Sequence, residues 1–395
     1  MFQTFTPASK YLFAKKVTIF VRLTLVLSLS YNFIAPFVAR AAPVPVITIS
    51  GPNEGFIGES QTFTLTFDNT GVISPTIGYG PYIDLYLPID SNGETGEGLT
   101  FSSASYIGNS INATTYLCTG ANIIHPLTGL SVACTLGQQL AVLELPFGSF
   151  TNNQPAASID VNTTSSTAID AGVPHTITAR AGFQFGSDAL DNKSADPVIS
   201  STLSSPFVYT PTAFKLSKSY IGRENETATG PNSPHQYRLD VDISAGQTIT
   251  NLIITDVLPA NVQFIAVDSI SPGCSIVSSP TGAGGILEVS CLSVTGSASS
   301  ADVSVLLSFF VPRDDASAVA VINPSTGSPV TSLNDSLAGA MWTPIDPDDP
   351  SSSVSSNGSS TDHTLTDRAI AIQKSVATIT NTGASGYTPG GYPYL

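Results

Sequence analysis

Apolar and polar residues alternate with a period of two along most of the chain after residue 42. In segment 61–67, Phe63, Leu65 and Phe67 share one face while threonines occupy the other. Segments 237–243 and 302–311 also place apolar residues at every second position. This alternation is typical of strands with one buried face, and the Gly, Pro, Asn, Asp and Ser clusters between the runs predict turns. The pattern predicts an all-β protein, with short helical turns only near residues 333–342.

The strand pattern occurs twice along the chain. Five landmarks follow in the same order in both halves, at separations of 156 to 171 residues: Pro88 and Pro259, Phe101 and Phe264, Cys118 and Cys274, Cys134 and Cys291, and Pro146 and Pro312. The alternative is a general likeness among β-sandwiches, but a shared order with offsets that differ only by loop-sized amounts favours a repeat. We therefore predict tandem Ig-like antiparallel β-sandwiches over residues 43–208 and 209–368, with a linker near 200–211.

A third copy is predicted to begin near residue 369. Segment 372–376 is similar to segment 216–220, and Lys374 occupies the position of Lys218. Residues 369–395 hold too few strands to close a sandwich core. The sequence therefore predicts an incomplete repeat there, either because the chain is a fragment or because it is naturally truncated.

The first 42 residues are typical of a secretory signal peptide. A basic start is followed by the apolar run 23–30 and by the small-residue motif Ala39-Arg40-Ala41, so we predict cleavage after Ala41 or Ala42. The alternative is an uncleaved membrane anchor over 17–38, but Arg22 would then sit inside the span at a cost of about 3 kcal/mol. The predicted location is secreted or on the cell surface.

The charge balance excludes one class of partner. The chain carries 14 Lys and Arg against 29 Asp and Glu, a net charge of −15. Removing residues 1–42 takes away five basic and no acidic residues, so −15 becomes −20. Because nucleic-acid binding depends on clustered basic side chains, we predict no nucleic-acid partner.

The four cysteines predict two disulfides. Four cysteines allow three pairings, and equivalent positions in the two repeats favour Cys118–Cys134 and Cys274–Cys291. An oxidising compartment preserves such bonds, and each would contribute roughly 3 kcal/mol on the chain-entropy model. A zinc site needs closer cysteine pairs than these, which leaves free buried thiols as the other alternative.

Two segments resemble a bacterial surface-repeat family catalogued as "domain of unknown function eleven". They are Gly58-Glu-Ser-Gln-Thr-Phe-Thr-Leu-Thr-Phe-Asp-Asn-Thr-Gly71 and Ile254-Thr-Asp-Val-Leu-Pro-Ala-Asn-Val-Gln-Phe-Ile-Ala-Val267. Lys374-Ser-Val376 and Tyr387-Thr-Pro-Gly390 are similar to the family's opening segment. The resemblance spans about residues 45–395 and implies Ig-like repeats that act as stalks or adhesin-like modules without catalysis. The first copy departs from the pattern at Asp84-Leu-Tyr-Leu-Pro88, where Thr-Asp-x-Leu-Pro would be expected.

Motifs for catalysis are missing from the sequence. The four histidines, His125, His175, His235 and His363, all lie near turn residues, and no Gly-x-Ser-x-Gly, His-Glu-x-x-His or P-loop motif is present. We predict that the protein is not an enzyme, and a secreted hydrolase is the least favoured alternative.

Calcium is the one cofactor that the sequence suggests. Carboxylates at close spacing suit Ca²⁺, and two loops carry them, although neither matches an EF-hand. The candidates are Asp188, Asp191, Asp196, Asp346, Asp348 and Asp349. The alternative is that these acidic loops are solvated. No other cofactor is expected.

One covalent modification is conceivable from the residue types. Some surface sandwiches carry a Lys–Asn isopeptide bond, which needs a buried carboxylate beside the pair. Lys215 or Lys218 on the first strand of the second repeat and Asn334 near its last strand are the candidate partners. The alternative is that all three are ordinary surface residues.

The predicted function is a structural or adhesive repeat module of an exported bacterial surface protein. Its expected partners are further repeats or an anchor in the same full-length protein. The alternative is a module that binds carbohydrate or a host protein through exposed loop aromatics, with Tyr79, Tyr82 and Tyr106 as the candidate stacking patch. Exposed, clustered tyrosines would favour binding, and buried ones would favour the structural role.

Overall fold

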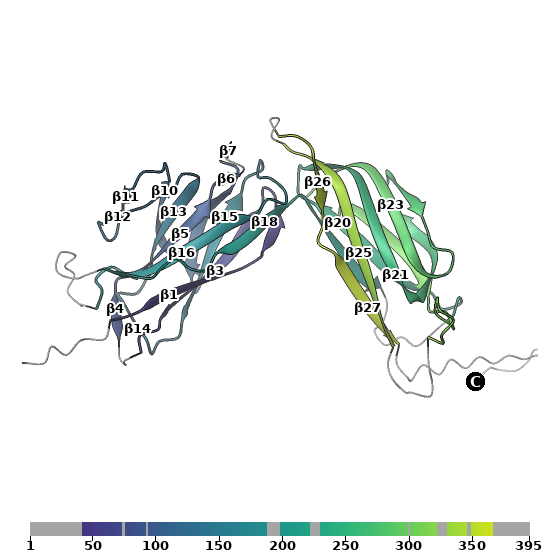
Figure 1. Ribbon diagram of the computed structural model, residues 1–395, viewed down its shortest axis with the longest axis horizontal. Helices are drawn as coiled ribbons and strands as arrows, with labels where there is room; N and C mark the ends of the chain where they lie inside the picture. The colour runs from purple at the N-terminus through teal and green to yellow at the C-terminus, as the bar shows by residue number, and fades with distance from the viewer. Residues whose placement is uncertain are drawn as a thin grey trace, which may run out of the picture.

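The computed structural model describes residues 42–72, 76–91, 94–187, 198–221, 230–298, 301–321, 330–345 and 349–365. Over these residues the chain is all-β and folds into two Ig-like β-sandwiches, as the alternation predicts (Figure 1). The predicted signal peptide, apart from Ala42, and the incomplete repeat at 369–395 lie outside the described residues. No helix among the described residues has the length and hydrophobicity of a membrane span.

The first sandwich, unit 1, ends at Thr212. One sheet has the order β1-β3-β15-β8-β9, and the other has β10-β13-β5-β16-β18-β2 with β17 beside β16. Phe63, Leu65 and Phe67 of β3 face Ile83 and Leu85 of β5 in one buried core. Its strands are β1 (Pro45–Ser50), β2 (Glu54–Phe56), β3 (Ser60–Asn69), β4 (Ile77–Tyr79), β5 (Pro81–Pro88), β6 (Asp90–Ser91), β7 (Glu94–Thr95), β8 (Leu99–Tyr106), β9 (Asn109–Ser110), β10 (Asn112–Leu117), β11 (Ile123–Ile124), β12 (Ser131–Val132), β13 (Gln138–Glu144), β14 (Ser149–Thr151), β15 (Ala157–Ser165), β16 (His175–Phe183), β17 (Ile199–Ser200) and β18 (Phe207–Thr212).

The second sandwich, unit 2, is built around one strand of 23 residues, β21. The first part of β21 pairs with β23 and β25, and its last part pairs with β24. One strand therefore contributes to both layers around the core. The strands of unit 2 are β19 (Phe214–Ile221), β20 (His235–Ile243), β21 (Thr248–Ile270), β22 (Cys274–Ser278), β23 (Ala283–Thr295), β24 (Val303–Phe310), β25 (Val330–Thr343), β26 (Ser352–Ser355) and β27 (Ser359–Leu365).

The two units share their connectivity. In unit 1, one sheet contains the strand order β1-β3-β15-β8 and the other contains β10-β13-β5-β16. The equivalent strand orders in unit 2 are β19-β20-β24-β21 and β22-β23-β21-β25. The helical turns predicted near 333–342 are wrong, because these residues belong to β25. Its inward positions include Ser336, Ala338 and Ala340. Because these residues are small, the alternation of large apolar and polar side chains that is typical of strands is weak in this segment.

The units meet at a buried junction rather than at a flexible linker. Only Ala213 separates β18 from β19, and β18 pairs within unit 1, so the boundary lies after Thr212 rather than at 208/209. Ile57 and Ile169 of unit 1 are buried in the hydrophobic core cluster of unit 2. Figure 1 shows the two bodies touching at one end only. The predicted linker at 200–211 is therefore largely strand, because β17 and β18 lie on β16.

Candidate functional site

Both predicted disulfides are present, and they have different positions in the fold. Cys274 and Cys291 are register partners on β22 and β23. The Cys118–Cys134 bond closes a loop of sequence separation 16 that carries β11 and β12. This loop packs on the outer face of the β5–β13 pair, where it covers Tyr86, Leu140 and Val142.

A lysine, an aspartate and an asparagine meet inside unit 2. Lys218 lies at an inward position of β19, two residues after the buried Leu216, and its side chain is fully buried. Its ammonium nitrogen, Nζ, lies 4.6 Å from the centre of the Tyr237 ring and donates a hydrogen bond to Asp256 Oδ1. A lysine in such surroundings is costly unless it is paired.

Asp256 reaches the core because of a bulge in β21. The register of β21 against β25 shifts around Asn251, which has a φ of 52°. Asparagine tolerates this left-handed conformation better than most residues. The shift moves the inward face of the strand from Ile249 to the even-numbered positions, so that Ile254, Asp256 and Leu258 are all buried.

Asn334 completes the group from β25. Ser336 is the register partner of Asp256, and Asn334 lies two residues away on the same inward face, where diagonal neighbours come within reach of each other. Its side chain is fully buried, and neither its amide nitrogen nor its amide oxygen has a hydrogen-bond partner of good geometry within the described structure. The Oδ2 atom of Asp256 is also buried without such a partner.

Burial shifts both ionisable groups of this cluster toward neutrality. Desolvation lowers the pKa of Lys218 to about 8, although the charge of Asp256 opposes the shift. Desolvation raises the pKa of Asp256, and the opposing contributions of Lys218 and Asn334 are smaller. Both shifts ease the movement of one proton from the amine to the carboxyl. The site thus holds an amine, a carboxyl group and a carboxamide together in a buried enclosure.

The other lysine candidate faces away from this cluster. Lys215 Nζ lies 4.7 Å from the centre of the Phe56 ring and 3.5 Å from the carbonyl oxygen of Glu54, at the junction with unit 1. Of the two lysines that the sequence offered as partners for Asn334, only Lys218 contacts Asp256, the carboxyl group beside Asn334.

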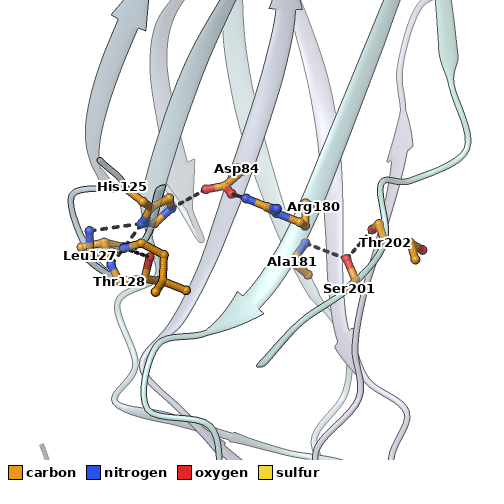
Figure 2. Close-up of polar contacts among 9 residues, drawn as sticks. Asp84, His125, Leu127, Thr128, Arg180, Ala181, Ser201 and Thr202 are labelled. Carbon is orange, nitrogen blue, oxygen red and sulfur yellow. Dashed lines mark hydrogen bonds and ion pairs between the residues drawn. The ribbon is translucent and has the colours of Figure 1, made fainter. Parts of the chain in front are cut away.

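A second buried polar cluster lies under the Cys118–Cys134 loop (Figure 2). His125 Nε2 lies 2.7 Å from Asp84 Oδ1, while Arg180 donates from Nε and Nη2 to Asp84 Oδ2 at 3.1 and 2.5 Å. Burial acts to lower the pKa of Arg180, but the hydrogen bond and charge of Asp84 outweigh it and raise the pKa. The three side chains tie the loop to β5 and β16.

The geometry of His125 opposes a catalytic role. Its Nδ1 accepts hydrogen bonds from the backbone N–H groups of Leu127 and Thr128 at 3.3 and 3.1 Å. Nε2 must therefore carry the proton that is donated to Asp84. With both ring nitrogens engaged and the side chain 1% exposed, this His–Asp pair has no free nitrogen with which to act as a general base.

Sequence reasoning missed Asp84, Arg180 and Asp256 as site residues. Asp256 had a readable signal, because it occupies the same strand face as Ile254 and Leu258. Asp84 had none, because it alternates with the core residues Ile83 and Leu85 and should face solvent. It is buried only because a loop from elsewhere in the chain covers that face.

The predicted aromatic patch is wrong, because Tyr82 is only 2% exposed. Tyr82 lies under the same loop, with its ring centre 5.0 Å from that of His125. Tyr79 and Tyr106 are partly buried, and Tyr106 packs edge-on against Phe147. The three rings thus offer no exposed stacking surface.

The calcium candidates fall largely outside the described residues. Asp188, Asp191, Asp196, Asp346 and Asp348 are among those not described. Asp349 brings a carboxylate oxygen within 4.8 Å of those of Glu94 and Glu97. The calcium hypothesis stays a prediction.

Unit 1 is expected to lose stability as the pH falls below about 6.5, the ordinary histidine value. Desolvation lowers the pKa of His175, and the charge of Asp170 only partly offsets it. The unfolded chain therefore takes up a proton that the folded unit resists, so the stability present above the unfolded pKa is lost as the pH falls. Urea unfolding between pH 7.5 and 5 would show this loss. His175→Phe should flatten the profile, and an equally steep profile would contradict the assignment.

Comparison with known proteins gives weak structural matches only. No family profile matches the sequence, and no curated protein matches it. A cohesin module from a Clostridium perfringens family 33 glycoside hydrolase is 11% identical, with a TM-score of 0.27, over 43% of this chain and 98% of its own. A C-terminal fragment of the major pilin GBS80 of Streptococcus agalactiae is 12% identical, with a TM-score of 0.23, over 82% and 92%. A two-domain fragment of the major pilin SpaD from Corynebacterium diphtheriae is 10% identical, with a TM-score of 0.26, over 79% and 88%.

Proposed function

We propose that this chain is a non-enzymatic spacing module of an exported bacterial surface protein. The sequence supports export through residues 1–42, and the resemblance to surface repeats supports the location. Further repeats or an anchor in the same full-length protein are its expected partners. The burial of Tyr82 and the partial burial of Tyr79 and Tyr106 disfavour the alternative of a carbohydrate- or protein-binding patch.

The junction between the units is the observation that carries this proposal. A spacer must hold its parts at a fixed distance, and a flexible linker cannot do so. Here Ser244 Oγ donates to the Ile57 carbonyl oxygen at 2.5 Å. Gln247 receives the indole N–H of Trp342 and donates to the Thr167 carbonyl oxygen, at 2.9 and 3.2 Å. Apolar burial and directional hydrogen bonds together fix the angle between the units.

Breaking the junction is expected to free the two units from each other. Ile57→Asp places a charge where an isoleucine is 1% exposed, which the second core cannot accept without large cost. Spin labels, one in each unit, should give one narrow distance distribution in the unaltered protein and a broad one in Ile57→Asp.

The matched control for this variant is Ile107→Asp, because Ile107 is 78% exposed on unit 1. It should keep the narrow distribution. A broad distribution in the unaltered protein would contradict a fixed spacing.

Export is tested separately by expressing the full chain in a bacterial host and sequencing the N-terminus of the released protein, which should begin at Ala42 or Pro43.

A further inference from the structure

The geometry points to a self-formed amide bond between Lys218 Nζ and Asn334 Cγ, with Asp256 as the group that moves the proton. This inference goes beyond the spacing role, because it concerns a covalent modification inside unit 2. It needs no partner, cofactor or enzyme. The modified protein would carry a cross-link between β19 and β25.

Three polar atoms of the cluster are buried without a hydrogen-bond partner of good geometry. An asparagine side chain buried without hydrogen-bond partners is rare in folded proteins, and here the amide oxygen, the amide nitrogen and one oxygen of Asp256 share this condition. A buried lysine–aspartate pair is also costly compared with neutral groups. Joining Lys218 to Asn334 replaces a buried amine by a neutral amide, so the reaction removes the charge that makes the site unfavourable.

Each chemical role in the reaction is filled by a residue of the cluster. A neutral lysine is a nucleophile, and it is activated when desolvation disfavours its charged form. The carboxamide of Asn334 is the electrophile. Asp256 contacts Lys218 directly, and it lies close enough to Asn334 for hydrogen bonding between them to oppose the rise in the pKa of Asp256, so it is placed to act as both acid and base. The apolar walls exclude the water that would compete as a nucleophile.

The steps balance without any oxidant or co-reactant. The proton shared by the pair moves to Asp256, which then donates a hydrogen bond to the Asn334 Oδ1 atom. Lys218 Nζ attacks Asn334 Cγ, and Asp256 accepts a proton from the attacking nitrogen and delivers one to the departing amide nitrogen. One C–N bond forms, one C–N bond breaks, and one molecule of ammonia leaves.

Unit 1 provides an internal comparison. Its first strand, Pro45-Val-Ile-Thr-Ile-Ser50, contains no lysine, and no lysine occurs among the described residues of this unit. Its most deeply buried aspartate, Asp84, lies outside the core and is paired with Arg180, whose guanidinium stays protonated and is not a nucleophile. The structure therefore assigns the cross-link to unit 2 alone.

Mass spectrometry of the full chain tests the proposal. The intact, disulfide-oxidised protein should weigh less than its processed sequence by the mass of one ammonia, and digestion should yield one branched peptide that joins Lys218 to Asn334. Lys218→Met, Asp256→Ala and Asn334→Ala should each restore the full mass, while Lys215→Met should keep the loss. Tryptophan fluorescence of Trp342, the single tryptophan and 1% exposed in unit 2, would verify that each variant folds.

If a variant does not fold, mass spectrometry of the unaltered protein is still enough to refute the proposal. A folded protein of full sequence mass, with Lys218 and Asn334 recovered in separate linear peptides, would refute the bond. Loss of ammonia through a cyclic imide at Asn92-Gly93 or Asn357-Gly358 would also refute it, because the mass change would then map to a linear peptide.

Discussion

A single molecule pulled between residue 45 and residue 365 is expected to lengthen in one large step rather than two. Unit 1 has no cross-link between its first and last strands, so its unfolding should release roughly 500 Å of chain, while the 16-residue separation closed by Cys118–Cys134 stays shut. In unit 2, force that enters through β19 would pass across the Lys218–Asn334 bond into β25. The strands between them, β20 to β24, would carry no load.

Force spectroscopy with two changed conditions checks this expectation. Lys218→Met should add a second step of roughly 350 Å, because residues 219–333 could then extend outside the Cys274–Cys291 loop. A reducing agent should lengthen the first step by about 50 Å. In the cross-linked protein it should not produce a second step. Two large steps in the unaltered protein would contradict a covalent load path through unit 2.

Asp84→Ala is expected to lower the free energy of unfolding of unit 1 by about 3 kcal/mol. The substitution leaves Arg180 without its carboxylate, and it removes the acceptor that holds His125 and hence the Cys118–Cys134 loop. Far-UV circular dichroism during urea unfolding would follow both units, while Trp342 fluorescence reports unit 2 only. Asp84→Ala should therefore shift the unfolding transition that circular dichroism detects and Trp342 fluorescence does not.

A matched control uses the exposed pair of Arg238 and Asp240, whose Nε–Oδ2 separation is 2.8 Å. Asp240→Ala removes one partner of an ion pair that water already screens, so its effect should stay below about 1 kcal/mol. If Asp84→Ala were no more destabilising than this control, the buried cluster would not hold the loop in place.

Much of the fold follows from local patterns in the sequence. The alternation of Phe63, Leu65 and Phe67 predicts β3, and the equivalent spacing of cysteines in two repeats predicts both disulfide pairs. The alternation is a local signal, because every second side chain of a strand with one buried face points into the core. The strand β25 was missed because small residues occupy its inward positions, which weakens the hydrophobic signal.

The candidate sites were predictable only in part, because they depend on contacts between distant segments. Lys218 and Asn334 were candidate partners from their strands. Asp256 was not singled out, although it alternates with Ile254 and Leu258 on the inward face of β21 after the bulge at Asn251. The burial of Asp84 depends on a loop that begins more than 30 residues later in the chain. The alternation of apolar and polar residues along one strand does not indicate whether a segment from elsewhere in the chain covers the outer face of that strand.

The three strands that supply Lys218, Asp256 and Asn334 lie far apart along the chain, and this separation has a consequence for timing. A partly made or unfolded polypeptide cannot bring the amine to the carboxamide, so the reaction would begin only after β19, β21 and β25 have assembled. Newly folded molecules would still unfold reversibly, and cross-linked molecules would not. The mass of a molecule would thus report whether the reaction has already taken place in it.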